Sequence, residues 1–285
     1  MSKTIVFGVG GAGCGVLNHM IKSEEWKGTT FVAVDSDMRT LNCCKVQSKV
    51  LLIGESVQDR GMNDHIRSVR RVARRCANEI AEYLEGMDVA FILAGMGCVT
   101  GAGVAPILAE VAREMGILTV GIAFLPFRFE GRKRFEAAQL SLKEFKRSVD
   151  SLLVVDNEEL LKLVDELPKQ AVQGIKGLVE QNFEETRSAL SEAGSTVMGI
   201  GIEEGEKKVE AAIQTAMGFP LNVSAEEATR IIVNITTGPG ISPEEVERAM
   251  ENVREKMPSG ARLTFGQVID ASVGDCVKVT LFSTL

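Results

Sequence analysis

Two glycine-rich stretches of the sequence have the residue types that hold phosphate groups through the backbone. The first, Gly8 to Gly15, reads GVGGAGCG after the apolar run TIVF, and the second, Gly95 to Gly103, reads GMGCVTGAG. A backbone this free of side chains can turn so that successive N–H groups and the amino end of a helix point at anionic oxygens. No lysine follows the second stretch as a Walker loop requires, which excludes that type of loop. Two such stretches favour a polyphosphate ligand.

The first stretch alone also satisfies a dinucleotide-binding turn, and this alternative stays open. It contains the G-x-G-x-x-G pattern, and Asp35 stands about twenty residues on, where an NAD site has a ribose-binding carboxylate. An NAD-dependent oxidoreductase would leave the second stretch unexplained, and His19 and His65 are the only histidines available for acid–base chemistry. A third interpretation is that the glycines only permit close packing of helices on a sheet.

The elements that would position these stretches alternate between strand and helix. Short β-branched runs and longer amphipathic stretches follow one another from Lys3 to Asn157, with helices expected at 63–85 and 102–115. This order predicts an α/β fold with a doubly wound, mostly parallel sheet, which binds ligands at the carboxyl ends of its strands. We expect this nucleotide-binding domain to cover residues 1–166.

The pattern changes after the sixth expected strand. A long helical region from about Pro168 to Glu192 precedes a mixture of strands and helices. We therefore predict a central helix with an adjoining loop at 167–192 and a smaller α+β domain at 193–285. The last expected strand ends close to Leu285, so no extended tail for recruiting partners is expected.

Composition restricts the class of protein and its surroundings. The chain has 285 residues and a formal net charge of −7, which argues against general binding to nucleic acid or anionic lipid. The sequence has no signal-peptide layout and no apolar run of membrane-span length, so we expect a cytoplasmic protein without an integral membrane segment. The six cysteines form no C-x-x-C pair, so they are expected to be reduced thiols, and no side-chain metal site is expected.

Five stretches, in this order along the chain, resemble the nucleotide-binding loops of the FtsZ/tubulin superfamily. They are GVGGAGCG with AVDSD, AGMGCVTGAGVAP, PFRFEGRKR, VVDNEELL and AVQGI, and GCVTGAG matches the tubulin-type pattern G-G-G-T-G-T-G. Two later stretches, GSTVMGIGIEEGEKKVEAAIQTAMGFPL and RIIVNITTG, are similar to the second domain of that family. The resemblance covers the chain from Thr4 to about Phe282. It implies a GTP-binding domain joined by a central helix to a smaller α+β domain.

The resemblance assigns expected roles to residues of the first domain. Members bind GTP or GDP across the strand ends and polymerise head to tail, and Mg²⁺ should be held by phosphate oxygens and water, with Asp37 as the nearest carboxylate. Glu130 and Arg134 should lie beside the ribose and phosphates, and Asn157 and Glu166 should recognise guanine, with Asp165 as the alternative to Glu166. The residues implied to hold the phosphates are Gly10, Gly11, Ala12, Gly13, Cys14, Gly97, Cys98, Val99, Thr100, Gly101 and Gly103.

The resemblance also implies that a loop after the central helix completes the hydrolytic centre of the adjacent subunit. The best match places Asn182 and Glu185 at the two acidic positions of that loop and Glu180 at its asparagine, so one clear carboxylate remains. Apolar residues keep a near-helical spacing from Val172 to Leu190, which predicts that the loop is absorbed into one continuous helix. We therefore expect slow or partner-dependent GTP hydrolysis. The alternative is a nucleotide-binding scaffold or regulator without hydrolysis.

Two further features depart from the family pattern. Gly15 replaces the asparagine of the family, and Cys14 and Cys98 replace glycines, so their side chains must point away from the phosphates. A second departure is a row of arginines on one face of an expected helix, where the family has a glycine-rich loop. This face is either solvated or a contact for an acidic partner or an anionic membrane surface. Its members are Arg67, Arg70, Arg71, Arg74 and Arg75.

Overall fold

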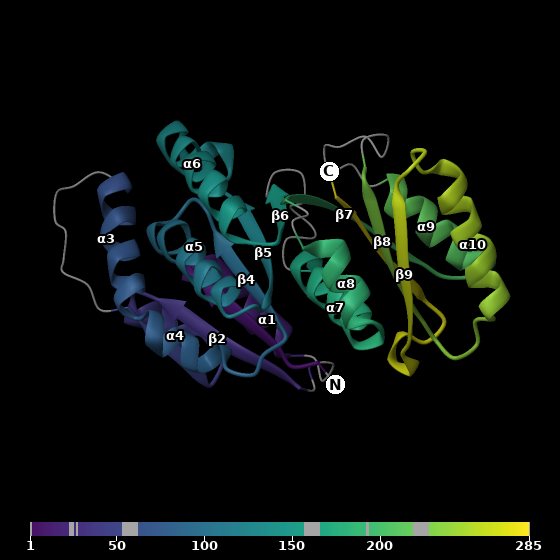
Figure 1. The fold of residues 1–285 in the computed structure, drawn as a ribbon, viewed down its shortest axis with the longest axis horizontal. Coiled ribbons are helices and arrows are strands. Elements are labelled where there is room, and N and C mark those ends of the chain that lie inside the picture. Colours follow the sequence, from purple (N-terminus) through teal and green to yellow (C-terminus); the bar gives the residue numbers. More distant parts are fainter. Residues whose placement is uncertain are drawn as a thin grey trace. The chain divides into compact units, whose positions relative to one another are not determined.

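The protein is described by a computed structural model (Figure 1). The chain divides into two compact units, residues 1–169 and residues 170–285, which we describe separately. Among the helices that the structure describes, none is long and apolar enough to cross a membrane. The described residues are 2–22, 26, 28–52, 62–156, 166–191, 194–218 and 228–284.

The strands described in the first unit form a parallel sheet. They are β1 (Thr4–Val9), β2 (Thr29–Asp35), β3 (Ser48–Leu51), β4 (Val89–Gly95), β5 (Leu118–Leu125) and β6 (Ser151–Asp156). Their order is β3-β2-β1-β4-β5-β6, and every neighbouring pair is parallel. Every residue of β1, β4 and β5 is buried, because a strand covered on both faces meets no water on either side. Burial on both faces explains why the sequences of these three strands are continuously apolar.

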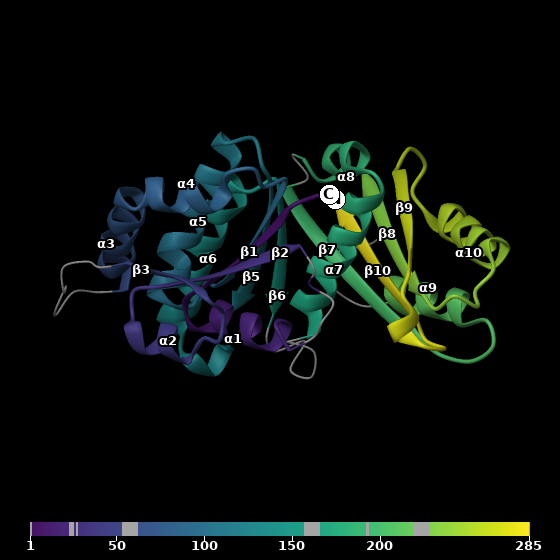
Figure 2. The same cartoon turned by 90° about the horizontal axis from the view of Figure 1, so that it is seen from below.

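Helices cover both faces of the parallel sheet. They are α1 (Gly10–Met20), α2 (Met38–Cys43), α3 (Met62–Arg75), α4 (Ala77–Leu84), α5 (Val99–Glu114) and α6 (Arg132–Ser148), with a 3-10 turn η1 (Arg128–Glu130) before α6. Figure 2 shows α1 and α2 on one side of the sheet and α3, α4 and α5 on the other. This arrangement confirms the predicted doubly wound α/β fold. The helix expected over 63–85 is two helices, because the chain leaves helical geometry at Cys76.

The second unit has a mixed sheet, as predicted for an α+β domain. Its described strands are β7 (Gly194–Glu203), β8 (Arg230–Thr237), β9 (Arg262–Ile269) and β10 (Val277–Thr284), and its helices are α7 (Glu166–Gln181), α8 (Phe183–Leu190), α9 (Lys208–Gly218) and α10 (Pro243–Lys256), with a 3-10 turn η3 (Ala271–Val273). The strand order is β7-β10-β8-β9, with β10 antiparallel to both neighbours and β8 parallel to β9. The first residues of α7 belong to the first unit.

Alternate residues of the second sheet face different helices. Val233 and Val279 belong to the apolar core with α9 and α10, whereas Thr280 lies against Gly174 of α7. A Cβ atom at Gly174 would lie 3.2 Å from the Thr280 side chain, so glycine allows α7 to approach the sheet closely. The period of two along the strands therefore places one helix pair on each face.

The prediction of one continuous helix after Pro168 is wrong. Helix α7 ends at Gln181, Asn182 has an extended backbone with φ −151° and ψ 93°, and α8 starts at Phe183. The break is stabilised locally, because the Asn182 side chain accepts a hydrogen bond from the backbone N–H of Glu185 at 3.2 Å. The apolar spacing continues across the break, which explains why the spacing alone indicated one helix.

Candidate nucleotide site

The carboxyl ends of neighbouring strands bring the two glycine stretches together. Val9 at the end of β1 is level with Ala94 of β4, and Gly95 at the end of β4 is level with Phe124 of β5. Because these strands are parallel and adjacent, the amino ends of α1 and α5 and the η1 turn all begin at one edge of the sheet. This is the edge at which such sheets bind ligands.

The amino end of α1 is open to an anion. Gly10 has a left-handed backbone (φ +72°), which starts the helix directly after β1. The N-cap residue, Val9, provides no side-chain hydrogen bond, and the first turn contains no acidic residue. Gly11 and Ala12 are exposed, and a Cβ atom at Gly11 would meet no heavy atom within 4 Å. The backbone N–H groups of this turn are therefore available for phosphate oxygens.

The second glycine stretch lies directly against the first. A Cβ atom at Gly10 would lie 3.0 Å from Cys98 Sγ and 3.3 Å from the backbone nitrogen of Gly101, and one at Gly95 would lie 3.0 Å from Ala12 Cβ. No acidic residue stands in the first turn of α5. Two helix amino ends with no acidic residue in their own first turns thus meet in one place. Their partial positive charges add where a polyphosphate would lie.

The two cysteine side chains in these stretches hydrogen-bond to the backbone of their own loops. Cys98 Sγ donates to the carbonyl of Gly95 at 3.2 Å and accepts from the backbone N–H of Gly101 at 3.2 Å, so it caps α5. Cys14 is buried, and its thiol donates to the carbonyl of Gly8 at 3.6 Å. Cys14 therefore lies in the interior, whereas Cys98 is partly exposed.

Several glycines of the predicted site also have packing roles. A Cβ atom at Gly13 would lie 2.3 Å from the Leu93 carbonyl oxygen, and one at Gly101 would lie 2.2 Å from the Gly95 carbonyl oxygen. At Gly103 it would lie 2.9 Å from the Ile66 carbonyl oxygen of α3. These positions require glycine even without a ligand, since a backbone oxygen cannot move aside at low cost. The packing interpretation therefore applies to these glycines, whereas Gly11 faces open space.

Thr100 is engaged in a hydrogen-bond network with the end of β2. Its hydroxyl donates to Asp35 Oδ1 at 3.1 Å and lies 3.0 Å from the Ser36 hydroxyl. Asp35 is only 4% exposed, and the same oxygen accepts from the backbone N–H groups of Ser36 and Asp37. The network ties the first turn of α5 to β2. The Thr100 hydroxyl therefore reaches a phosphate only if it exchanges Asp35 for the new partner.

The expected ribose and phosphate residues lie beside the second glycine stretch. Arg134 Nη1 pairs with Glu130 Oε2 at 2.7 Å, and Arg134 Nε donates to the carbonyl of Gly97. Glu130 Oε1 accepts from the backbone N–H of Phe127 at 2.8 Å, which holds the η1 turn in place. Arg134 thus places a guanidinium at the loop, where its charge is paired with Glu130.

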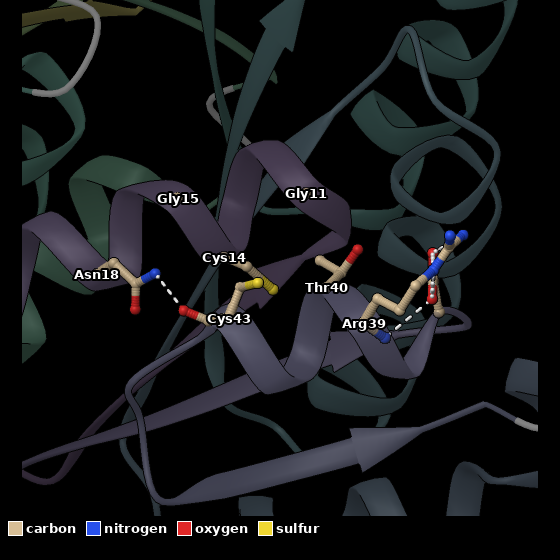
Figure 3. Close-up of a pocket in the computed structure, with 8 residues that line it drawn as sticks. Gly11, Cys14, Gly15, Asn18, Arg39, Thr40 and Cys43 are labelled. Atoms are coloured by element: carbon tan, nitrogen blue, oxygen red, sulfur yellow. Dashed lines mark hydrogen bonds and ion pairs between the residues drawn. The ribbon is translucent and has the colours of Figure 1, made fainter.

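A cavity of about 480 Å³ opens between α1 and α2 (Figure 3). Asn18 joins the two helices, because its Nδ2 donates to the Cys43 carbonyl at 3.1 Å and its Oδ1 accepts from the Lys45 N–H at 2.7 Å. The sequence reasoning missed Asn18, although Gly11 and Gly15 precede it by seven and three positions on one helix face. The lining residues are Gly11, Cys14, Gly15, Asn18, Asp37, Arg39, Thr40 and Cys43.

The Asp37 carboxylate is already engaged by one residue, Arg39, through two of its groups. Its carboxylate caps α2 by accepting from the Arg39 N–H at 2.9 Å and forms an ion pair with the Arg39 guanidinium at 2.9 Å. These contacts with Arg39 hold the pKa of Asp37 below its usual value. Elsewhere in the described part of the chain, no group of three or more His, Cys, Asp or Glu side chains is arranged to hold a metal ion. A phosphate-bound Mg²⁺ held mainly by water fits this donor set better than a protein cage.

Some predicted residues lie outside the described part of the chain. Asn157 and Asp165, expected to recognise guanine, belong to this group. Glu166 is the first residue of α7, and its side chain is likewise outside the description. Recognition of guanine by these residues stays a prediction.

The predicted catalytic residues lie at the α7–α8 corner of the second unit. Asn182 Nδ2 donates to Glu185 Oε2 at 2.9 Å, so the two side chains bind one another as well as capping α8. Both residues are exposed, as is Glu180, which lies 3.5 Å from Lys176 Nζ. The Asn182 amide and the carboxylates of Glu180 and Glu185 therefore lie on the exposed surface of this corner.

The predicted arginine face on α3 is partly neutralised within the chain. Arg70 pairs with Glu144 of α6, and Arg74 lies 3.7 Å from Glu110 of α5. Arg71 and Arg75 are exposed. Part of the arginine row thus serves to hold α3 on its neighbours.

Comparisons with known proteins identify the class of protein that this fold and site define. Residues 3–165 match the GTPase domain of the Tubulin/FtsZ family, and residues 194–284 match the C-terminal domain of the FtsZ family. The chain belongs to the Tubulin/FtsZ family of cytoskeletal GTPases. Membership of this GTPase family implies a site for GTP or GDP.

Similar solved structures agree with this assignment. FtsZ from M. jannaschii, in a point-mutant form, has a TM-score of 0.89 and 28% identity over 100% of this chain and 91% of that chain. An empty FtsZ dimer from M. jannaschii has a TM-score of 0.85 and 27% identity over 100% and 88% of the chains. The GDP-bound monomer of CetZ1 from Haloferax volcanii has a TM-score of 0.83 and 21% identity over 99% and 93% of the chains, which shows the fold alone. The predicted FtsZ/tubulin fold is confirmed.

Proposed function

We propose that this protein binds GTP at the paired glycine stretches and assembles head to tail into a filament in the cytoplasm. The observation that carries the proposal is the meeting of the α1 and α5 amino ends, with Gly11 exposed and Arg134 beside Gly97. Three linked phosphates carry several negative charges, which two helix amino ends and one guanidinium can neutralise together. The empty FtsZ dimer among the similar structures is consistent with self-association.

In this proposal GTP is hydrolysed between two copies of the chain. The exposed α7–α8 corner of one copy approaches the phosphates bound to the next copy, and the Glu185 carboxylate orients the attacking water and accepts its proton. Asn182 holds that carboxylate in place through the 2.9 Å hydrogen bond. Mg²⁺, when bound, neutralises charge on the phosphates. Because only one carboxylate at the corner is held by Asn182, we expect hydrolysis to be slow or to depend on a partner.

A scaffold that binds nucleotide without hydrolysing it is the alternative within the same family. Light scattering and phosphate release, recorded together after addition of GTP or GDP to the purified chain, separate the two functions. We expect scattering to rise with GTP and to be followed by phosphate release that depends on protein concentration. A rise without phosphate release supports the scaffold, and no response in either signal contradicts assembly.

The NAD-dependent oxidoreductase is less well supported than the GTP-binding filament. Its ribose-binding carboxylate would be Asp35, which is buried and accepts hydrogen bonds from Thr100 and two backbone N–H groups. These three contacts all use Oδ1 and tie α5 to β2, so a ribose would have to bind the other oxygen of a side chain that is only 4% exposed.

We also propose that the exposed arginines of α3 contact an acidic partner. Arg71 and Arg75 support this proposal, because both are exposed on a chain whose net charge is −7. Complementary charge attracts an acidic surface and is screened by salt.

A further inference from the structure

Two side chains with no role in the proposed function attach the α7–α8 corner to strands of the second unit. Gln181 connects the end of α7 to β9, and Arg230 connects β8 to the carboxyl end of α8. The hydrogen bond between Asn182 and Glu185 joins these two side chains to one another but does not attach them to the sheet. The position of this exposed corner therefore depends on attachments such as those of Gln181 and Arg230, besides the packing of the buried helix faces.

Gln181, the last residue of α7, binds the outer edge of β9. Its Nε2 donates to the backbone carbonyl of Gln267. Among the strands that the structure describes, β9 has only β8 as a neighbour, and the backbone N–H groups of Arg262 and Asp270 donate to the β8 side. Successive residues of a strand direct their backbone groups to opposite sides, so the Gln267 carbonyl points away from β8. The Gln181 amide thus binds a carbonyl that β8 does not reach.

Gly266 leaves the space that this contact requires. A Cβ atom at Gly266 would lie 2.3 Å from Gln181 Oε1 and 2.8 Å from Leu178 Cδ2. A side chain at this position would therefore displace the Gln181 amide or the end of α7. The amide oxygen lies against the bare glycine, while the amide nitrogen binds the carbonyl of the next residue of β9.

Arg230 holds the opposite end of α8. It is the first residue of β8, and its Nη1 donates to the carbonyls of Ser188 and Ala189, the latter at 3.2 Å. These carbonyls belong to the last turn of α8, where cations bind favourably. Because Arg230 fixes the carboxyl end of α8, its amino end, two residues after Gln181, is the end that the Gln181 contact controls.

We propose that Gln181 is a positioning residue for GTP hydrolysis, because it fixes the amino end of α8 and with it the Glu185 carboxylate. This inference rests on the proposed function. Asn182 connects the two, since its N–H donates to the Leu178 carbonyl at 2.9 Å and its carbonyl accepts from the Thr186 N–H at 3.1 Å. A shift at the end of α7 therefore reaches the residue that holds Glu185. A displacement of about 1 Å in a group that orients the attacking water can lower the rate by about a hundredfold.

The variant Gln181→Met tests this role, because methionine keeps the length of the side chain and removes the amide donor. We expect GTP turnover per filament subunit to fall by about tenfold at saturating GTP, whereas the GTP concentration for half-maximal turnover and the unfolding temperature stay unchanged. Gln181→Lys retains a donor of similar reach, so it should recover most of the turnover. Gln214→Met, at an exposed position of α9, is the matched control and should hydrolyse GTP normally.

A mixing experiment shows which copy carries the defect. The proposed function places the corner of one copy at the GTP of the next, so Gly11→Val, with a weakened nucleotide site and an intact corner, should complement Gln181→Met. In an equal mixture we expect turnover about fivefold above that of Gln181→Met alone, since half of the GTP held by that variant would meet an intact corner. The double variant Gly11→Val with Glu185→Gln is the control, and it should give no rise.

The outcomes separate the role of Gln181 from the proposed function. Normal turnover in Gln181→Met, beside lost turnover in Glu185→Gln, overturns the role of Gln181 and leaves the proposed function standing. Normal turnover in Glu185→Gln contradicts the proposed function and the inference that rests on it. A loss of turnover in Gln181→Met that Gly11→Val does not complement, or that accompanies a lower unfolding temperature, shows a general structural defect and also overturns the positioning role.

Discussion

At the scale of single residues, the glycines of the two stretches divide into those that the fold requires and those that a ligand would use. Gly101 packs against the Gly95 carbonyl oxygen, whereas Gly11 is exposed and faces open space. This division could not be predicted from the sequence, since both residues stand in similar glycine-rich stretches. It depends on which backbone atoms the fold brings within contact distance.

Substitution separates these two kinds of glycine. We expect Gly101→Ala to lower the free energy of unfolding by about 2 kcal/mol or more, because its Cβ would lie 2.2 Å from a backbone oxygen. We expect Gly11→Val to unfold at the temperature of the unmodified chain but to bind GTP about tenfold to a hundredfold more weakly, since its side chain displaces a phosphate contact. Thermal unfolding and binding calorimetry measure both effects.

Gly240→Val is the matched control for Gly11→Val. Gly240 also faces open space, but it lies in the second unit after β8. Unchanged GTP affinity is expected for this control. Equal affinity in Gly11→Val and Gly240→Val would contradict the role of Gly11.

The Glu185 side chain gives the most direct residue-scale prediction about hydrolysis. Glu185→Gln keeps an oxygen that accepts from Asn182 Nδ2, so the corner keeps its geometry, but it removes the carboxylate. We expect GTP hydrolysis per filament subunit to fall by about a hundredfold or more, while GTP binding stays unchanged. Phosphate release at a fixed filament concentration measures this effect. The neighbouring exposed variant Glu184→Gln should hydrolyse GTP normally, and equal rates in the two variants would refute the assignment.

At the scale of elements, the alternation of strands and helices in the first unit was predictable, whereas the helix breaks at Cys76 and at Asn182 were not. Buried parallel strands read as apolar runs, and glycine stretches mark the turns between them, so local sequence is sufficient there. At Asn182 the apolar spacing continues although the helix stops. The available signal was the capping pair Asn182 and Glu185, three positions apart. The network of Thr100 and Asp35 joins residues far apart in sequence and has no local signal.

The cap at Asn182 should make a measurable contribution to the stability of the chain. We expect Asn182→Ala to destabilise the chain by about 1 kcal/mol, since the Glu185 N–H loses its acceptor, and Asn182→Ser to retain most of the stability. Urea unfolding monitored by circular dichroism measures the difference. Identical unfolding midpoints for the alanine and serine variants would show that the cap has no effect.

The arginine row of α3 supports a prediction about partner contacts. Arg71→Glu with Arg75→Glu changes exposed charges that form no ion pair among the residues the structure describes, so the fold should be retained. We expect this double variant to lose bundling of filaments or binding of an acidic partner. In the unmodified chain, we expect the same bundling or binding to weaken as the salt concentration rises. Sedimentation of assembled protein measures bundling. Bundling and partner binding equal to those of the unmodified chain would contradict the proposed role of these arginines.

At the scale of the whole molecule, the family and the order of the two domains could be read from the sequence. Five loop patterns in one order, with two later stretches, indicated the FtsZ/tubulin fold. The matches to the family and the similar solved structures confirm that fold. Assembly could not be derived in the same way, because it depends on surfaces of two copies. The proposal therefore connects the α7–α8 corner of one copy with the glycine stretches of the next.

The central claim is that the two glycine stretches together hold a guanine nucleotide. Titration calorimetry of the nucleotide-stripped full chain with GTP, ATP and NAD⁺ tests it most directly. The account predicts that GTP binds once per chain and at least about tenfold more tightly than ATP, and that NAD⁺ gives no heat. Binding of NAD⁺, or no heat with GTP from a folded chain, would contradict it.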